Sequence, residues 1–155
     1  MELKELMAAF CGKAGIEPVV PNEIGAYELT AGETAFSVIA SDERGEAALF
    51  VAEVGPRPNV RAGELAELLL GVNYLFSATG GATVAYDPSQ QRYMLQREVP
   101  LVALSVDDFV AALDAFVTKA DELRMFLTQA DETLEAVDEA ATEETAMGSV
   151  NFMQV

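Results

Sequence analysis

Residues 68–88 read LLLGVNYLFSATGGATVAYDP and mark the clearest change of local structure in the chain. Apolar residues recur around much of the circumference of a helix predicted over about 64–77, which implies burial on more than one side. Paired glycines at positions 80 and 81 end this helix, because glycine readily adopts left-handed backbone angles. A strand is predicted over 82–86, and the Asp-Pro pair after it predicts a turn. The stretch therefore places a helix directly before a strand, with a glycine turn between them.

Upstream of this stretch, the pattern predicts one helix and three strands. Apolar residues at spacings of three and four predict the helix over 1–14. Runs bounded by turn residues predict strands over 24–31, 34–41 and 47–54. In the second and third strands both alternating sets of residues are largely apolar, whereas a sheet covered by helices on one side only would show cleaner alternation.

Downstream, one strand and one long helix are predicted. The strand covers 92–99. Ser105 begins the helix, because its hydroxyl can accept a hydrogen bond from a first-turn amide, and Asp107 and Asp108 favour the positive end of the helix. The helical stripe continues to Leu127. We therefore predict an α+β fold of two layers, with the order helix, three strands, helix, two strands, helix, and an antiparallel sheet connected as a meander.

The length of 155 residues fits a single domain. We predict that this domain covers 1–130 and that an acidic, mobile tail covers 131–155. The tail has seven Asp and Glu residues and no Lys or Arg, and its few apolar residues cannot offset the cost of ordering its backbone. Its removal should leave the fold intact. The alternative is that residues 150–153 dock on an apolar groove when no partner is bound.

The formal net charge is −17, from 9 basic and 26 acidic side chains. Binding to nucleic acids and to anionic membranes depends on Lys and Arg, so we expect neither as a partner. A basic or apolar protein partner is the natural complement. The single cysteine, Cys11, excludes an internal disulfide and fits a reducing cytosol. We expect no signal peptide and no membrane span, because the longest apolar run is far shorter than about 20 residues.

The residue types that common catalytic and metal sites require are missing. The chain has no histidine, so it has no Ser-His or Cys-His pair, and one cysteine cannot hold zinc. The paired glycines follow a helix instead of preceding one, so they do not form a phosphate loop. The acidic tail lacks the alternating ligands and central glycine of a calcium loop. We therefore expect no enzymatic activity, no metal and no cofactor.

The apolar residue fraction of 51% is high for one small domain. A homodimer would explain the surplus, and so would a groove for an extended or partly unfolded peptide; the two can coexist. A tight monomer with a bulky core is the alternative. We place the dimer interface on the broadly apolar second helix. The predicted interface residues are Leu65, Leu68, Leu69, Val72 and Leu75.

The opening stretch resembles the class I chaperones of type III secretion systems, the Tir-chaperone (CesT-like) family. The shared features are a leucine-rich helix with an asparagine near its end, here Asn73, a small-residue turn, and a strand that ends in Asp87-Pro88. A strand rich in Leu and Arg follows, matched by residues 94–97. The last helix has an acidic start and then Phe109 and Leu113. The resemblance covers roughly residues 1–127 and makes 1–130 a secretion chaperone-like domain.

This resemblance implies a cytoplasmic bacterial homodimer without enzymatic activity. Such a chaperone binds the N-terminal chaperone-binding segment of a secreted effector in extended form, keeps it competent for secretion and delivers it to the export apparatus, whose ATPase is a further candidate partner. The alternative is an acidic adaptor or regulator of the same fold that binds a folded protein. We predict that the client contacts apolar residues of the first helix and the three-stranded region. These are Leu6, Phe10, Phe36, Val38, Leu49 and Val51, although alternate strand residues must fill the core.

Overall fold

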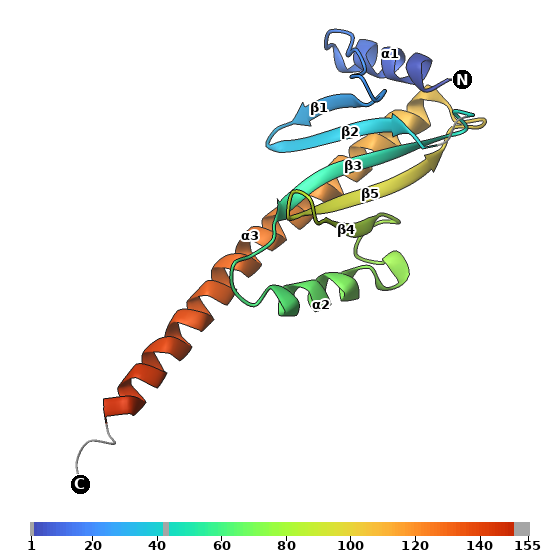
Figure 1. Cartoon of the computed structure of the whole chain (residues 1–155). Helices are drawn as coiled ribbons and strands as arrows, with labels where there is room; N and C mark the ends of the chain where they lie inside the picture. The colour runs from blue at the N-terminus through green and yellow to red at the C-terminus, as the bar shows by residue number, and fades with distance from the viewer. Residues whose placement is uncertain (1, 42–43, 151–155) are drawn as a thin grey trace.

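The computed structural model describes residues 2–41 and 44–150 and confirms the α+β class. One antiparallel sheet is combined with three α-helices and one short 3₁₀ helix (Figure 1). The elements are α1 (Leu3–Ala14), β1 (Tyr27–Ala31), β2 (Thr34–Ala40), β3 (Ala47–Pro56), α2 (Ala62–Val72), η1 (Tyr74–Phe76), β4 (Thr83–Asp87), β5 (Arg92–Pro100) and α3 (Val106–Val150).

The sheet does not continue as a simple meander. Its strand order is β1-β2-β3-β5-β4, so β5 lies beside β3, and β4 occupies the edge. The two longest strands pair with each other, in a register that runs from Ala47 opposite Pro100 to Pro56 opposite Arg92. Pairing of the two longest strands forms the longest ladder of backbone hydrogen bonds. The connection through α2 leads from β3 to β4 at the edge of the sheet and leaves the place beside β3 for β5.

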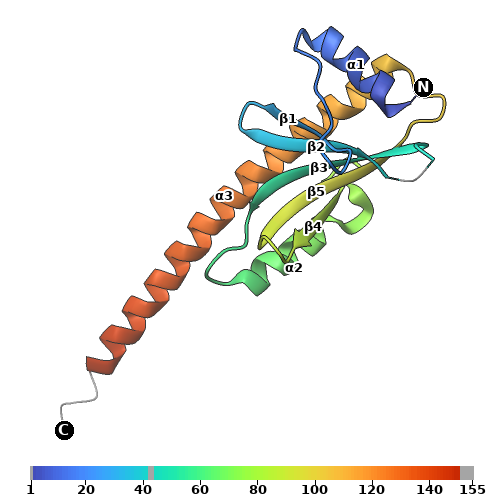
Figure 2. The same ribbon diagram turned by 45° about the horizontal axis from the view of Figure 1, so that its top comes forward.

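The core lies between the sheet and α3, which runs diagonally across one face of the sheet (Figures 1 and 2). Along β3, alternate side chains are buried, because successive residues of a strand point to opposite faces. The Phe50 ring packs edge-on against Phe109 and Phe116 of α3, at centroid distances of 5.7 and 5.6 Å. These contacts fix α3 on the sheet.

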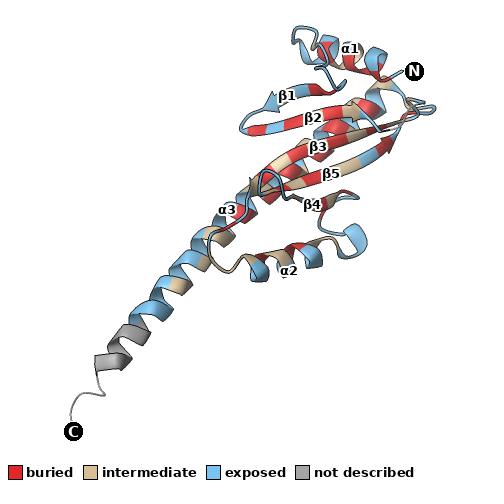
Figure 3. Cartoon of the chain, in the orientation of Figure 1, coloured by how far each residue is buried: buried red, intermediate tan, exposed pale blue. Residues whose placement is uncertain are grey.

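The other face of the sheet is only partly covered. Along β3, half-buried residues alternate with buried ones (Figure 3). Leu49 and Val51 are half-buried on the open face, while their neighbours Phe50 and Ala52 are buried on the α3 side. The apolar residues on both faces of β2 and β3 therefore do not reflect helices on both sides within one chain. They reflect one core face and one open apolar face.

The α2 helix ends earlier than its apolar pattern predicts, at Val72 instead of about residue 77. The side chain of Asn73 leaves the helix and bonds the backbone of Val84 in β4: its amide donates to the Val84 carbonyl at 3.0 Å, and its oxygen accepts from the Val84 N–H at 2.7 Å. Leu75 and Phe76 then adopt left-handed angles, with φ of 57° and 54°. An α-helix cannot continue through such angles.

The α3 helix begins as predicted and extends much further than its buried stripe. The Ser105 hydroxyl accepts a hydrogen bond from the Asp108 N–H at 3.1 Å, which confirms the predicted cap. The helix has 45 residues, or about 67 Å at 1.5 Å per residue, and it projects well past the sheet (Figure 1). Residues 131–150 are therefore helical, while the mobility of this segment stays a prediction, and residues 151–153 of the alternative docking contact lie outside the described residues.

Candidate binding surfaces

The open face of the sheet carries a shallow apolar hollow of about 420 Å³. Val51 and Met94 line it from β3 and β5, and Leu29 and Ala35 line it from the first two strands. Four polar residues also line the hollow: Glu28, Thr30, Ser37 and Glu53. Glu53 also forms an ion pair with Arg92, which joins β3 to β5 at the hollow. The hollow offers apolar anchor sites of the size of single side chains on a surface that the chain's own helices do not cover.

One edge of this sheet is open to strand addition. Among the described strands, β1 has a hydrogen-bonded neighbour on one side only. The opposite edge strand, β4, is partly closed, because Asn73 already pairs with both backbone groups of Val84. Backbone groups that point outward from an edge strand can pair with an extended peptide. The hollow and the β1 edge together can hold an extended chain through both side chains and backbone.

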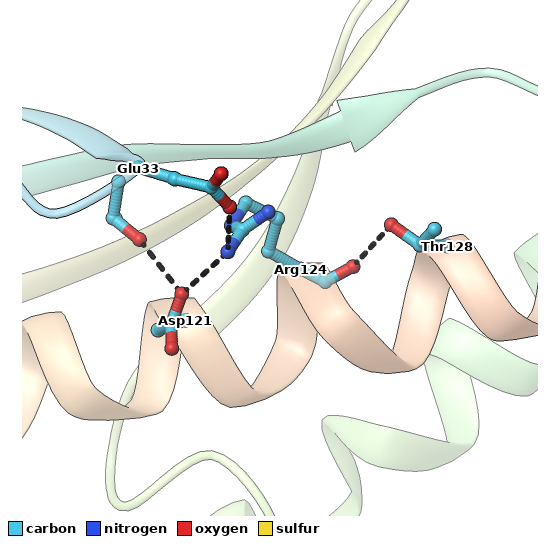
Figure 4. A network of polar contacts seen from close by, with 5 residues as sticks. Glu33, Asp121, Arg124 and Thr128 are labelled. Carbon is cyan, nitrogen blue, oxygen red and sulfur yellow. Dashed lines mark hydrogen bonds and ion pairs between the residues drawn. The ribbon is translucent and has the colours of Figure 1, made fainter.

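A polar network fastens the β1–β2 hairpin to α3 (Figure 4). Arg124 of α3 contacts Glu33 of the hairpin turn at 3.0 Å and Asp121 at 2.8 Å. The Thr34 hydroxyl donates to the same Asp121 carboxylate at 3.2 Å. The hydrogen bond from Arg124 lowers the pKa of Asp121, with a smaller contribution from Thr34. The network fixes the position of the hairpin whose outer strand is the open edge.

The six predicted client residues do not lie on one surface. Leu6 and Val38 are fully buried and Phe36 is buried, so these three fill the core of the single chain. Leu49 and Val51 lie on the open sheet face, and Phe10 of α1 is half-buried. The alternation of β2 and β3 could not separate these groups, because both of its residue sets are apolar.

Sequence reasoning did not single out the exposed apolar residues in the segment between α1 and β1. Val20 and Ile24 expose 81% and 75% of their surface. Prolines at 18 and 21 break the helical and strand patterns there, so no periodicity indicated which way a side chain points.

The second helix and the turn after it expose a separate apolar surface. Of the predicted dimer residues, Leu65 and Leu69 are buried, Val72 is half-buried, and Leu68 and Leu75 are exposed. Three further exposed residues were not in the prediction. They are Leu70, Tyr74 and Phe76.

In the described part of the chain, none of the helices is both long and apolar enough to cross a membrane. Within the same residues, no group of three or more Cys, Asp or Glu side chains is placed to hold a metal ion.

Comparison with known proteins identifies a matching family and several structures with a similar fold. The family model for the Tir chaperone protein (CesT) family matches residues 5–124. No curated protein sequence matches the chain. The crystal structure of the ExsC–ExsE complex has a TM-score of 0.68 and 21% identity, covering 81% of this chain and 96% of the other. The structure of the HopA1–SchA chaperone–effector complex has a TM-score of 0.64 and 18% identity, covering 79% and 92%.

A third similar structure is the Yersinia pestis type III secretion chaperone SycH with a fragment of YscM2. It has a TM-score of 0.57 and 19% identity, covering 76% of this chain and 95% of that one. At these identities the structures show a shared fold. The family model spans 120 of the 155 residues and confirms the resemblance seen around Asn73 and Asp87. The chain therefore belongs to the Tir chaperone protein (CesT) family, a family of type III secretion chaperones.

Proposed function

We propose that this chain binds the N-terminal chaperone-binding segment of a secreted effector in extended form, keeps it competent for secretion and delivers it to the export apparatus. The observation that carries the proposal is the open apolar face of the sheet beside the free β1 edge. Complexes with partner proteins among the similar structures, one described as chaperone–effector, support the same role.

The binding mechanism follows from the two parts of this surface. Client backbone pairs with β1, which requires little sequence specificity. Client side chains enter the hollow and contact Val51 and Met94, and Leu49, half-buried in the same strand two residues before Val51, extends this apolar contact. An extended client loses conformational entropy on binding, so a large apolar contact area is needed to offset that cost. Among the six predicted residues, we therefore assign direct client contact to Phe10, Leu49 and Val51, and we assign core packing to Leu6, Phe36 and Val38.

We further propose that the functional unit is a homodimer formed through α2 and η1. Leu75 and Phe76 are held at left-handed angles with their side chains exposed. For residues other than glycine such angles cost about 1–2 kcal/mol each. Burial of these two side chains against a second copy would offset that cost. A two-fold dimer would also present two client surfaces to one long segment, which raises its affinity through avidity.

The proposal also covers where the protein works and whether it catalyses a reaction. We expect a chaperone that works in the bacterial cytoplasm without enzymatic activity and without a cofactor. The export-apparatus ATPase is a further candidate partner for the loaded complex. Membership of a chaperone family supports these expectations.

The test is purification of the tagged chain from its host, with identification of bound proteins by mass spectrometry. We expect an effector whose N-terminal segment becomes protected from protease only in the complex. The variant Val51→Asp should lose the effector, because an unpaired charge would enter the apolar hollow. Val102→Asp, a charge at an exposed position between β5 and α3, is the matched control. Capture of a folded partner with no protected N-terminal segment would favour an adaptor or regulator instead.

A further inference from the structure

A second apolar hollow lies between α2 and the C-terminal half of α3. Its α2 wall contains Leu65 and Leu68, which belong to the helix that we assign to the dimer, whereas its α3 wall has no part in the proposed function. We call this hollow the α2–α3 groove. It has a volume of about 440 Å³, and all of its lining residues belong to these two helices. The apolar residues of the groove are Leu65, Leu68, Phe126, Ala130 and Leu134. Leu68 and Phe126 remain exposed at 49% and 39%, so a ligand could still bury considerable apolar surface there.

The groove exists because the apolar stripe of α3 does not stop where the sheet ends. Leu123 and Leu127 are buried against the sheet, and Ala130 and Leu134 are partly buried against the same core. The next residue of the stripe, Val137, is 46% exposed. The spacing is alternately four and three, which keeps these side chains on one side of a helix.

An ion-pair cluster holds the two walls in position. Arg61, just before α2, contacts Asp138 of α3 at 3.8 Å and Glu64 of α2 at 3.4 Å. The start of α2 is therefore joined to α3 one turn beyond Leu134. The groove is formed before any ligand arrives, which lowers the entropic cost of binding.

The C-terminal wall of this groove lies beyond the residues that the family model matches. The family model ends at residue 124, and the wall begins at Phe126. The matched region alone therefore does not form the groove.

The walls favour a helical ligand over an extended one. The backbone N–H and C=O groups of α2 and α3 bond within their own helices, so they cannot pair with an extended peptide. A helix satisfies its own backbone groups and needs only an apolar stripe to fill the groove. From Phe126 to Val137 the wall is about 16 Å long, which matches about three turns of a helix.

The charges around the groove favour a basic ligand. The neighbouring Arg61 is paired with two carboxylates, and Lys119, two turns before Phe126, is paired with Glu122. The segment 131–143 carries six Asp and Glu residues and no Lys or Arg. A second copy of this segment would bring like charges together, which disfavours the chain itself as the occupant.

We propose that the α2–α3 groove binds an amphipathic helix of a protein partner, in which Lys and Arg flank an apolar stripe. The partner is distinct from the extended client segment, and the proposal does not depend on how that segment binds. Fluorescence anisotropy of the full-length chain tests it with two synthetic helical peptides of about 18 residues. Both carry Leu at positions i, i+3 and i+7, and they differ only in having Lys or Glu at the flanking positions. We expect the Lys peptide to bind and gain helical circular dichroism, and the Glu peptide to bind at least about tenfold more weakly.

Three variants locate the site. Gln129→Lys places a positive charge at the exposed rim, and Phe126→Ala removes apolar surface from the α3 wall without changing the helix that we assign to the dimer. Each should weaken the Lys peptide by about tenfold or more. Ala115→Lys adds the same charge as Gln129→Lys at an exposed position of α3, about 21 Å closer to the start of the helix. It should leave the affinity unchanged within about twofold.

Three results would overturn the proposal. Equal binding of the Lys and Glu peptides would show that the groove does not select a basic ligand. Equal weakening by Ala115→Lys would show general attraction to an acidic protein. Burial of the α3 wall residues Phe126 and Leu134 between two copies, seen as cross-links or hydrogen-exchange protection in the free protein, would make the groove a dimer contact. Binding of the extended client segment is measured on the same variants. Gln129→Lys should not alter that binding, so failure of the groove proposal can be distinguished from failure of the proposed function.

Discussion

The side chain of Asn73 joins the end of α2 to the edge of the sheet, and its replacement gives a direct test of this connection. In Asn73→Ala, two hydrogen bonds of 3.0 and 2.7 Å to the Val84 backbone are lost. Each is part-buried, and hydrogen bonds of this kind contribute about 0.5–1.5 kcal/mol. The expected loss is therefore about 2 kcal/mol in the free energy of unfolding. For a chain of this length, that corresponds to a fall of about 4–8 °C in Tm.

The assay is chemical and thermal unfolding followed by circular dichroism. Asn73→Asp is a second informative variant: its carboxylate can still accept from the Val84 N–H, but it cannot donate to the Val84 carbonyl. We expect it to lose at least as much stability as the alanine variant at neutral pH, because a negative charge then faces a carbonyl oxygen. Asn59→Ala, at an exposed loop position, is the matched control and should change stability by less than about 0.5 kcal/mol.

The result that would refute this reasoning is an Asn73→Ala variant as stable as the Asn59→Ala control. In that case the strained turn at Leu75 and Phe76 would be held by packing alone. A loss of stability accompanied by conversion of a dimer to a monomer would extend the reasoning, because η1 carries the exposed apolar residues that we assign to the dimer.

Three further predictions concern the dimer, the length of the domain and the polar network. Leu75→Asp should convert the dimer to a monomer in sedimentation experiments, because Leu75 is 75% exposed in the single chain and the new Asp would place an unpaired charge in the interface. Val102→Asp, at a similarly exposed position, should leave the dimer intact. A monomeric wild-type chain at micromolar concentration would contradict the dimer. A chain that ends at residue 141 should keep the wild-type Tm. A chain that ends at residue 130 should lose about 1–2 kcal/mol of unfolding free energy, because it lacks the partly buried Leu134 and the Arg61–Asp138 ion pair. Equal Tm values for the two chains would support the predicted boundary at 130. Hydrogen bonds from Arg124 and Thr34 lower the folded-state pKa of Asp121 below 3.8, so its stabilising contribution is present above pH 4 and is lost as the pH falls through the folded-state pKa. In denaturant titrations, the stability difference between wild type and Asp121→Asn should therefore shrink below pH 4. A difference that stays constant with pH would contradict the role of the charge.

Sequence periodicity determined the elements and their order, because it is a local property. The stripe of Leu3, Leu6 and Met7 predicted α1, and the cap at Ser105 predicted the start of α3. The stretch from Asn73 to Pro88 indicated the family, since its residue types meet particular backbone needs. Asn73 bonds a strand edge, and the glycines at 80 and 81 have φ of 62° and 87°. These requirements can be recognised without knowledge of distant contacts.

Only the tertiary structure decided what depends on distant contacts. The pairing of β3 with β5 joins residues up to 53 positions apart, and strand pattern alone does not choose between that partner and β4. Leu49 and Phe50 look alike as apolar strand residues, but α3 covers only the face on which Phe50 lies. The end of the buried stripe at Leu127 suggested the end of the domain, whereas contacts of Leu134 and Asp138 continue along α3 to the start of α2. Hydrophobicity predicts that a side chain will be covered, and the three-dimensional arrangement decides whether its own chain or a partner covers it.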